Sequence, residues 1–333
     1  MARKPRRKPR HHTARSWTDV LDQLYEGSWN AELRRFRSPF AFRGLSRADH
    51  RLSSSLTRLA AGRADVYRLE LSLLRNFRKY AHAEAAGTDS IWDWLALGQH
   101  RGLPTRLLDW TYSPLVALHF ATEDPHDFAE DGAVWAVNFV EANKRLPRRL
   151  KGMLDRERSD TFTVEMLADF ETLRDFDALR RDPFVVFVEP PAIDRRILNQ
   201  FALFSLMSSP LAVLDDWLMS HPEICRRVVV PAALKWEIRD KLDQANVNER
   251  VLFPGLDGLS RWLTRYYMLT PGAGTPATSL DDLRGARSAA RRDRERRAPS
   301  SPPVSAAAAS AKAPAFVSST GAEPHSGGRR RRR

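Results

Sequence analysis

The segment from His100 to Ala121 constrains the fold more than any other part of the chain, because it combines turn, strand and helix signals. It reads HRGLPTRLLDWTYSPLVALHFA. The pair Ser113-Pro114 is typical of a helix start, where Ser caps free backbone N–H groups and Pro takes the first helical position. The apolar run Leu115 to Phe120 then predicts a buried helix. The polar side chains ahead of it are not needed for a core, so they serve a site or pin a buried backbone.

Four of these polar side chains precede the predicted helix: Arg106, Asp109, Thr111 and Ser113. Backbone N–H groups and the helix dipole favour an anion at a helix start, which makes this segment a candidate phosphate site. Two structural interpretations remain open. Arg106 and Asp109 are three residues apart and could pair with each other. Thr111 and Ser113 could act as caps, which does not prevent them from lining a pocket.

The rest of the chain mixes helical and strand patterns without a regular βαβ alternation. Apolar spacings of three and four, with stop and cap signals, predict helices at 17–27, 65–86, 90–100, 231–244 and 256–267. Runs of branched and aromatic residues predict strands at 38–44, 133–140, 182–191, 198–207 and 226–231. This mixture favours an α+β fold, with a small mixed sheet and flanking helices in a single globular core.

The excess positive charge lies at the two ends of the chain. Of the formal net charge of +13, residues 1–15 carry +7 and residues 271–333 carry +8, which leaves −2 for 16–270. The tail is rich in Ala, Ser, Pro and Arg and poor in large apolar residues, so we expect disorder over both 1–15 and 271–333. Such basic ends favour a nucleic acid or an acidic protein as partner.

Several classes of protein are disfavoured. Cys225 is the only cysteine, which excludes an intramolecular disulfide and a cysteine zinc site and favours a reducing cytoplasm. No apolar run approaches the roughly 18 residues of a membrane span, and the basic start is not followed by the apolar stretch of a secretory signal. The chain has no phosphate-binding P-loop and no dinucleotide glycine fingerprint, and we expect no metal site.

Three motifs together resemble the FRG domain. They are FAFRG at 40–44, LALGQHRGLPTRLLDWTYSPLVALHFA at 95–121 and DGAVWAVN at 131–138, and the Phe-Arg-Gly that names the family is Phe42-Arg43-Gly44. The later RRILNQFALF also resembles a motif that accompanies the domain. We therefore expect an FRG domain over 16–140, with 141–270 as the second part of the same core.

The layout of this family is similar to that of ADP-ribosyltransferases, and that similarity implies a nucleotide ligand, NAD. Arg43 with Gly44 would hold phosphates, Thr111 or Ser113 would brace the pocket, and Gln200 would take the place of the catalytic Glu. A Gln brings no negative charge to an oxocarbenium-like transition state. Glu189 is the reserve candidate for a general base.

Two functions from different classes follow. The first is a bacterial ADP-ribosyltransferase-like enzyme, and the second is a non-catalytic module that binds a nucleotide or a partner. Two interpretations of Arg43 remain open. It binds phosphate, or it forms a buried ion pair that satisfies Asp109. His100 is a ligand-binding residue or a hydrogen-bonded core histidine, and His119 is expected to serve packing. Three tryptophans could stack on a base but are more typical of a core: Trp92, Trp94 and Trp110.

Overall fold

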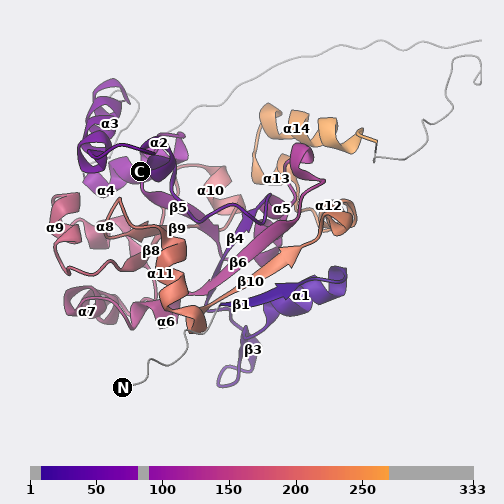
Figure 1. Cartoon of the computed structure of the whole chain (residues 1–333), viewed down its shortest axis with the longest axis horizontal. Coiled ribbons are helices and arrows are strands. Elements are labelled where there is room, and N and C mark those ends of the chain that lie inside the picture. The colour runs from indigo at the N-terminus through magenta and orange to yellow at the C-terminus, as the bar shows by residue number, and fades with distance from the viewer. Residues whose placement is uncertain (1–8, 82–89, 270–333) are drawn as a thin grey trace, which may run out of the picture. The chain divides into compact units, whose positions relative to one another are not determined.

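An eight-stranded mixed sheet forms the centre of the fold in the computed structural model, which describes residues 9–81 and 90–269 (Figure 1). The strand order is β1-β10-β6-β4-β5-β9-β8-β7, and neighbours are antiparallel except for the parallel pairs β1–β10 and β7–β8. The α+β prediction with a single core is confirmed, although the sheet is larger than the small sheet expected. The strands are β1 (Arg10–Thr13), β4 (Phe40–Leu45), β5 (Leu107–Thr111), β6 (Gly132–Asn138), β7 (Phe162–Thr163), β8 (Val185–Glu189), β9 (Ala202–Met207) and β10 (Cys225–Val230).

Helices surround this sheet, and their caps follow the sequence. Ser90 forms a capping box with Asp93, and Ser113 accepts from the Val116 N–H ahead of Pro114, as predicted. Within 9–81 and 90–269, no helix is both long and apolar enough to cross a membrane. The helices are α1 (Trp17–Tyr25), α2 (Ser55–Leu59), α3 (Val66–Ala81), α4 (Ile91–His100), α5 (Pro114–Ala121), α6 (Phe139–Asn143), α7 (Arg148–Glu157), α8 (Val164–Leu167), α9 (Leu173–Asp177), α10 (Arg195–Asn199), α11 (Leu214–Ser220), α12 (Lys235–Gln244), α13 (Glu249–Leu252) and α14 (Leu256–Tyr266), with short 3-10 turns η2 (Pro125–Asp127), η3 (Pro222–Ile224) and η4 (Ala232–Leu234).

Successive strand residues point to opposite faces of the sheet, and this alternation separates the core into layers. Trp135 and Phe187 share one face, where they pack with α6 and α11. On the other face, Val134 packs with α1, α5 and α12, whereas Val186 packs with α4, α7, α8 and α9. Figure 1 shows α1 and α12 beside β1 and β10, and α7, α8 and α9 beside β8. Two separate helical groups therefore cover the two ends of the second face.

The N-terminal prediction needs a correction. Residues 10–13 form β1, which pairs in parallel with β10 from Arg10 opposite Arg226 to Thr13 opposite Val229. Ala14 is buried just after it, so the chain is anchored before α1 begins. The predicted disorder over 1–15 is therefore wrong for β1. Residues 1–8 and the predicted disordered tail at 271–333 lie outside the described residues.

A second correction concerns the strand predicted over 198–207. The first part of that range belongs to α10, because Asp194 accepts hydrogen bonds from two backbone N–H groups at the helix start. Phe201 then adopts a φ of 47°, which turns the chain into β9. The apolar pattern predicted the strand correctly for 202–207. The residues before it are helical because Asp194 caps α10.

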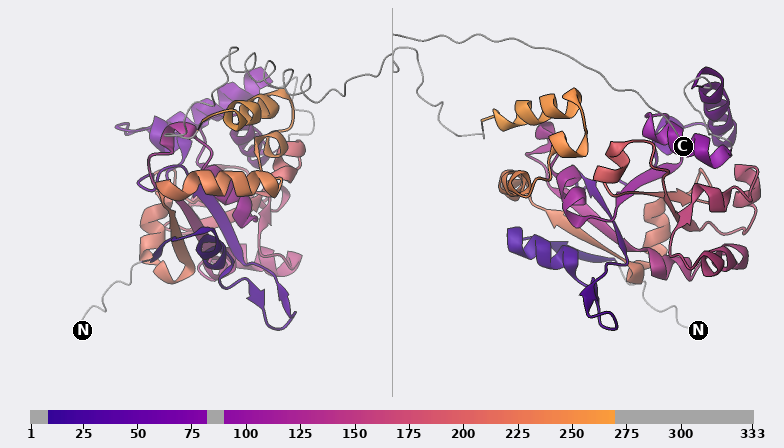
Figure 2. Two further views of the ribbon diagram at one scale, coloured as in Figure 1. Left: turned by 90° about the vertical axis from the view of Figure 1, so that its right-hand side faces the viewer. Right: turned by 180° about the vertical axis from the view of Figure 1, so that it is seen from behind.

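A small antiparallel hairpin projects from the body of the fold. Its strands are β2 (Trp29–Asn30) and β3 (Arg35–Phe36), and Figure 2 shows it extending away from the main sheet. Its aromatic side chains are exposed but contact each other edge to face, with ring centroids of Trp29 and Phe36 5.3 Å apart.

Candidate functional site

A cleft of about 1150 Å³ opens on the sheet face between the two helical groups. It lies where β4 and β5 diverge, since these neighbours pair only at Phe42 opposite Thr111. Chain segments far apart in sequence supply its lining. They are 42–46 and His50, 99–100, 109–111, 120 and 123–126, 196–197, 200, 202 and 204, then 249, 260–261, 264–265 and 268.

Arg43 spans the gap between β4 and β5. Its Nη1 donates to the backbone carbonyl of Asp109 and lies 4.0 Å from that residue's Oδ2. The Arg43 side chain is only 20% exposed, and its Nε is buried without a hydrogen-bond partner among the described residues. Burial lowers the pKa of Arg43, which Asp109 partly offsets. Arg43 therefore bonds to the backbone of Asp109 and lies near its carboxylate, but that carboxylate is exposed, so the predicted buried ion pair is not formed. Arg43 also lines the cleft.

The Asp109 side chain is more accessible than that of Arg43, because 63% of it is exposed. Gln99 holds the carboxylate in place, since its Nε2 donates to Oδ1 at 3.0 Å and to Oδ2 at 2.9 Å. Gln99 is in turn oriented by Thr105, whose hydroxyl donates to Oε1 at 2.6 Å. A positioned, solvent-facing carboxylate in the cleft is the result. Sequence reasoning missed Gln99, although its place in the quoted motif was a signal.

His100 also lines the cleft, at the end of α4. Its Nε2 lies 2.7 Å from Oδ2 of Asp194, and its side chain is 8% exposed. Asp194 caps α10 with its other oxygen, so the same carboxylate fixes both a helix start and the imidazole. Both interpretations of His100 are therefore compatible with its position, since it is hydrogen-bonded and at the cleft surface.

Thr111 and Gln200 line the cleft but use their polar groups to hold the chain. The Thr111 hydroxyl donates to the backbone carbonyl of Gln200 at 2.7 Å. The Gln200 amide donates to the carbonyl of Leu252 at 2.9 Å, which ties the end of α13 to the α10 turn. Arg43, Thr111 and Gln200, which the transferase resemblance suggests, thus line one cleft, but each makes structural bonds there.

Three predicted site residues do not line the cleft. Arg106 is 3% exposed and its guanidinium bonds to Glu70 and Asp177, so the predicted pair with Asp109 is wrong. The guanidinium pairs with Glu70 on α3 and Asp177 on α9, because these acids are shielded from water and would be costly to leave unpaired. Ser113 caps α5, and its own N–H donates to Thr111.

Glu189, the reserve base, lies at the end of β8 outside the cleft lining. It accepts hydrogen bonds from the hydroxyls of Tyr112 at 2.7 Å and Thr161 at 2.9 Å. Desolvation and this carboxylate raise the pKa of Tyr112 above its usual value. Glu189 therefore anchors a tyrosine and does not line the cleft with Arg43 and Gln200.

Gly44 serves packing at the edge of the cleft. A Cβ at this position would lie 1.9 Å from the carbonyl oxygen of Ala117 and 2.5 Å from the N of Ala121. The missing side chain lets α5 lie directly on β4. The glycine of the Phe-Arg-Gly motif thereby sets the distance between the strand and the helix.

The predicted tryptophans are core residues. Trp92 donates from Nε1 to the carbonyl of Phe170, and Trp94 packs edge to face on Phe77. Trp110 borders the cleft but is 3% exposed, and its Nε1 donates to Ser205 at 2.8 Å.

Cys225 is buried as well, and burial raises the pKa of its thiol to about 12.

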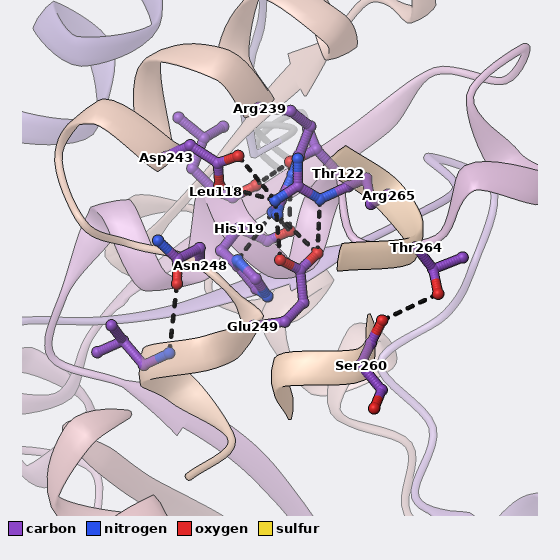
Figure 3. Close-up of polar contacts among 11 residues, drawn as sticks. Leu118, His119, Thr122, Arg239, Asp243, Asn248, Glu249, Ser260, Thr264 and Arg265 are labelled. Atoms are coloured by element: carbon purple, nitrogen blue, oxygen red, sulfur yellow. Dashed lines mark hydrogen bonds and ion pairs between the residues drawn. The ribbon is translucent and has the colours of Figure 1, made fainter. Parts of the chain in front are cut away.

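A buried charge network supports the cleft wall formed by α13 and α14 (Figure 3). Glu249 accepts from Nη2 of Arg239 at 2.8 Å and from Nε and Nη2 of Arg265 at 2.7 and 2.8 Å. Asp243 takes a further bond from Arg265 at 2.7 Å. Burial opposes ionisation, but the bonds from Arg265 and the charge of Arg239 lower the pKa of Glu249 to about 2. One carboxylate thus joins α12, α13 and α14.

His119 extends this network into α5. Its Nδ1 lies 2.8 Å from Nη1 of Arg239, and because a guanidinium only donates, Nδ1 is the acceptor and the ring is neutral. Burial, together with the charge of Arg239, lowers the pKa of His119 well below its ordinary value. His119 is buried, as the prediction of a packing role requires. That prediction is incomplete, because the imidazole also takes part in the polar network.

We expect acid to destabilise the protein in two stages. The lowered pKa of His119 stabilises the fold above the ordinary histidine value of 6.5, and this contribution is lost as pH falls below that value. The lowered pKa of Glu249 stabilises the fold above 4.5, and this contribution is lost between pH 4.5 and about 2. Urea unfolding measured from pH 8 to pH 4 checks the first stage, which should be absent in His119→Gln. An unchanged slope between pH 7 and pH 5 in that variant would contradict it.

Sequence reasoning also missed six charged residues of the cleft lining: Glu123, Asp124, Arg196, Glu249, Arg261 and Arg265. Glu123 is half-buried, and burial raises its pKa, which the arginines partly oppose. Arg196 and Arg261 are exposed residues of α10 and α14. Arg196 stands in the motif RRILNQFALF but was not singled out within it, and Arg261 lies outside every motif. Only the folded arrangement brings them to the cleft.

Comparison with known proteins gives one match. No curated protein and no solved structure matches the chain. The model of the FRG domain matches residues 38–130, which lie within the 16–140 expected for this domain and contain Arg43, Gly44, His100 and Asp109. This chain therefore contains an FRG domain, as its motifs predict.

Proposed function

We propose that the cleft binds a nucleotide, with NAD as the preferred ligand, and that the protein is an ADP-ribosyltransferase-like enzyme. The observation that carries this proposal is the shared cleft of Arg43, Asp109, Thr111 and Gln200. Its volume of about 1150 Å³ lies slightly above the range of about 300–1,000 Å³ that is usual for ligand sites, which suits a dinucleotide better than a small metabolite. Aromatic, cationic and carboxylate groups along the cleft match the base, phosphate and ribose parts of such a ligand.

The chemistry of glycosyl transfer requires a carboxylate near the ribose. The bond between ribose C1′ and the nicotinamide nitrogen breaks, and its electron pair leaves with nicotinamide. An oxygen nucleophile, water in the simplest case, bonds to C1′ and releases its proton to solvent. Gln200 supplies no charge for the developing cation and is bonded to Leu252. Glu189 is bonded to Tyr112 and does not line the cleft. We therefore assign this role to Asp109, whose carboxylate is exposed and held by Gln99.

The experiment measures binding and turnover separately. Calorimetric titration of the full chain with NAD is expected to give heat, and chromatography is expected to detect released nicotinamide. Asp109→Asn is expected to keep NAD affinity within a few-fold and to slow nicotinamide release by about 10²–10³, because one stabilising charge is removed. Asp49→Asn is the matched control, since Asp49 is an exposed partner of Arg47 outside the cleft lining.

The second candidate, a non-catalytic nucleotide-binding module, has specific support. The polar groups of Thr111 and Gln200 are engaged in chain-to-chain bonds rather than directed at a ligand. NAD binding without nicotinamide release in the wild type would favour this module. The absence of binding by NAD, ADP-ribose and short RNA would remove both candidates. Recruitment of nucleic acid or an acidic protein by the basic ends stays a prediction, because most of their residues lie outside the described part.

A further inference from the structure

Two arginines at one side of the cleft lack an acidic partner. Arg196 lies in the first turn of α10 and Arg261 lies within α14, and both line the cleft. Their guanidinium carbons are 5.0 and 5.1 Å from the ring centre of Phe253. Within 9–81 and 90–269, neither guanidinium forms an ion pair or a hydrogen bond. Stacking on a shared ring orients both without neutralising either.

The other two arginines of the cleft are already engaged. Arg43 bonds to the carbonyl of Asp109, and Arg265 bonds to Glu249 and Asp243. By contrast, Arg196 and Arg261 keep their donors free. Their guanidinium carbons lie at most about 10 Å apart, since both are about 5 Å from one ring centre. An anion with two phosphate groups can therefore accept hydrogen bonds from both guanidiniums at once.

None of the acids that line the cleft pairs with Arg196 or Arg261 among the described residues. Asp124 accepts a hydrogen bond from the backbone N–H of His126. Glu249 is fully used by Arg239 and Arg265. Glu123 is half-buried and feels the charges of both Arg196 and Arg261, yet it bonds to neither, so it neutralises only part of their charge. A carboxylate beside two guanidiniums also suits a nucleotide, because it can accept hydrogen bonds from sugar hydroxyls next to the phosphates.

We propose that Arg196 and Arg261 form the phosphate subsite of the cleft, so that the diphosphate of the ligand is bound there and not at Arg43. This inference rests on the proposed function in taking the ligand to be a nucleotide. It also divides the ligand between two parts of the chain. The FRG-matched residues 38–130 contact the ribose that reacts, and residues beyond them hold the phosphates.

The test compares ADP-ribose with adenosine, which lacks phosphates, by calorimetry on the full chain. Arg196→Gln and Arg261→Gln are each expected to weaken ADP-ribose binding about tenfold, and the double variant about 100-fold, with adenosine affinity changed less than about twofold. Arg195→Gln and Arg250→Gln are matched controls, because both are exposed arginines outside the cleft lining and should bind as the wild type does. Arg196→Lys with Arg261→Lys keeps the charge and should recover part of the affinity.

Two outcomes would overturn the subsite. One is wild-type affinity for ADP-ribose in the double variant, and the other is loss of the phosphate contribution in Arg43→Gln alone. Titration with inorganic pyrophosphate separates this inference from the proposed function. Pyrophosphate binding that the double variant loses, without any nucleotide binding, keeps the subsite and rejects the nucleotide function. If the double variant still binds the nucleotide, only the subsite is rejected. If none of the probes binds to the wild type, both the subsite and the nucleotide function are rejected.

Discussion

Replacing Glu249 with glutamine is expected to lower the free energy of unfolding by about 3–5 kcal/mol. The carboxylate is 3% exposed and receives bonds from both Arg239 and Arg265. Glutamine keeps the size but removes the charge, and it leaves two buried guanidiniums without their shared partner. Breaking a buried ion pair from one side has a cost of this order. Urea unfolding followed by circular dichroism at pH 7 measures the change.

Glu237→Gln is the matched control for this substitution. Glu237 also pairs with a cation, Lys241 at 2.5 Å, but both side chains are more than 40% exposed. A solvent-exposed pair contributes little, so the control should change the free energy of unfolding by less than about 1 kcal/mol. Equal effects of the two substitutions would show that the network in Figure 3 does not stabilise the fold.

Replacing Gly44 with alanine is expected to destabilise the protein by at least about 3 kcal/mol. The added Cβ would meet the backbone of α5, 1.9 Å from the Ala117 oxygen and 2.5 Å from the Ala121 N. Backbone atoms cannot rotate away as a flexible side chain does, so α5 must move off β4 as a unit. Thermal unfolding of the purified variant measures this loss, and the expected result includes a failure to accumulate folded protein.

Gly152→Ala provides the comparison for Gly44. It lies within α7, and a Cβ there meets no atom within 4 Å. Alanine is the better helix former, so this variant should be more stable than the wild type by about 0.5–1 kcal/mol. A Gly44→Ala protein that melts close to the wild-type temperature would show that β4 and α5 are not held at the distance described.

Local signals in the sequence predicted much of the fold. The caps Ser90 and Ser113 set the starts of α4 and α5 where the sequence places them, because a cap involves residues only three positions apart. The resemblance to ADP-ribosyltransferases placed Arg43 in one pocket with Thr111 or Ser113. Of these two, Thr111 lines the cleft, because β4 and β5 pair next to Arg43, at Phe42 and Thr111, whereas Ser113 does not.

Pairing over long distances in the chain could not be predicted in this way. Arg106 bonds to Glu70 and Asp177, which come from α3 and α9, and a periodic pattern does not encode which acid an arginine meets. The strand β1 lies in a basic segment whose composition indicates disorder, but its backbone pairs with β10 from the other end of the described chain. Arg196 and Arg261 reach the cleft for the same reason, through tertiary packing alone.

The arginines of the proposed phosphate subsite lie outside residues 38–130, the segment that matches the FRG domain. Residues 38–130 supply part of the lining, and α10, α13 and α14 supply another part. The helices α13 and α14 are joined to His119 through Glu249 and Arg239, whereas α10 is joined to His100 through its capping residue Asp194. The proposed phosphate contacts are therefore separable from the matched segment. An engineered exchange of 195–269 between two chains with the same signature would transfer selectivity and leave the reacting end intact.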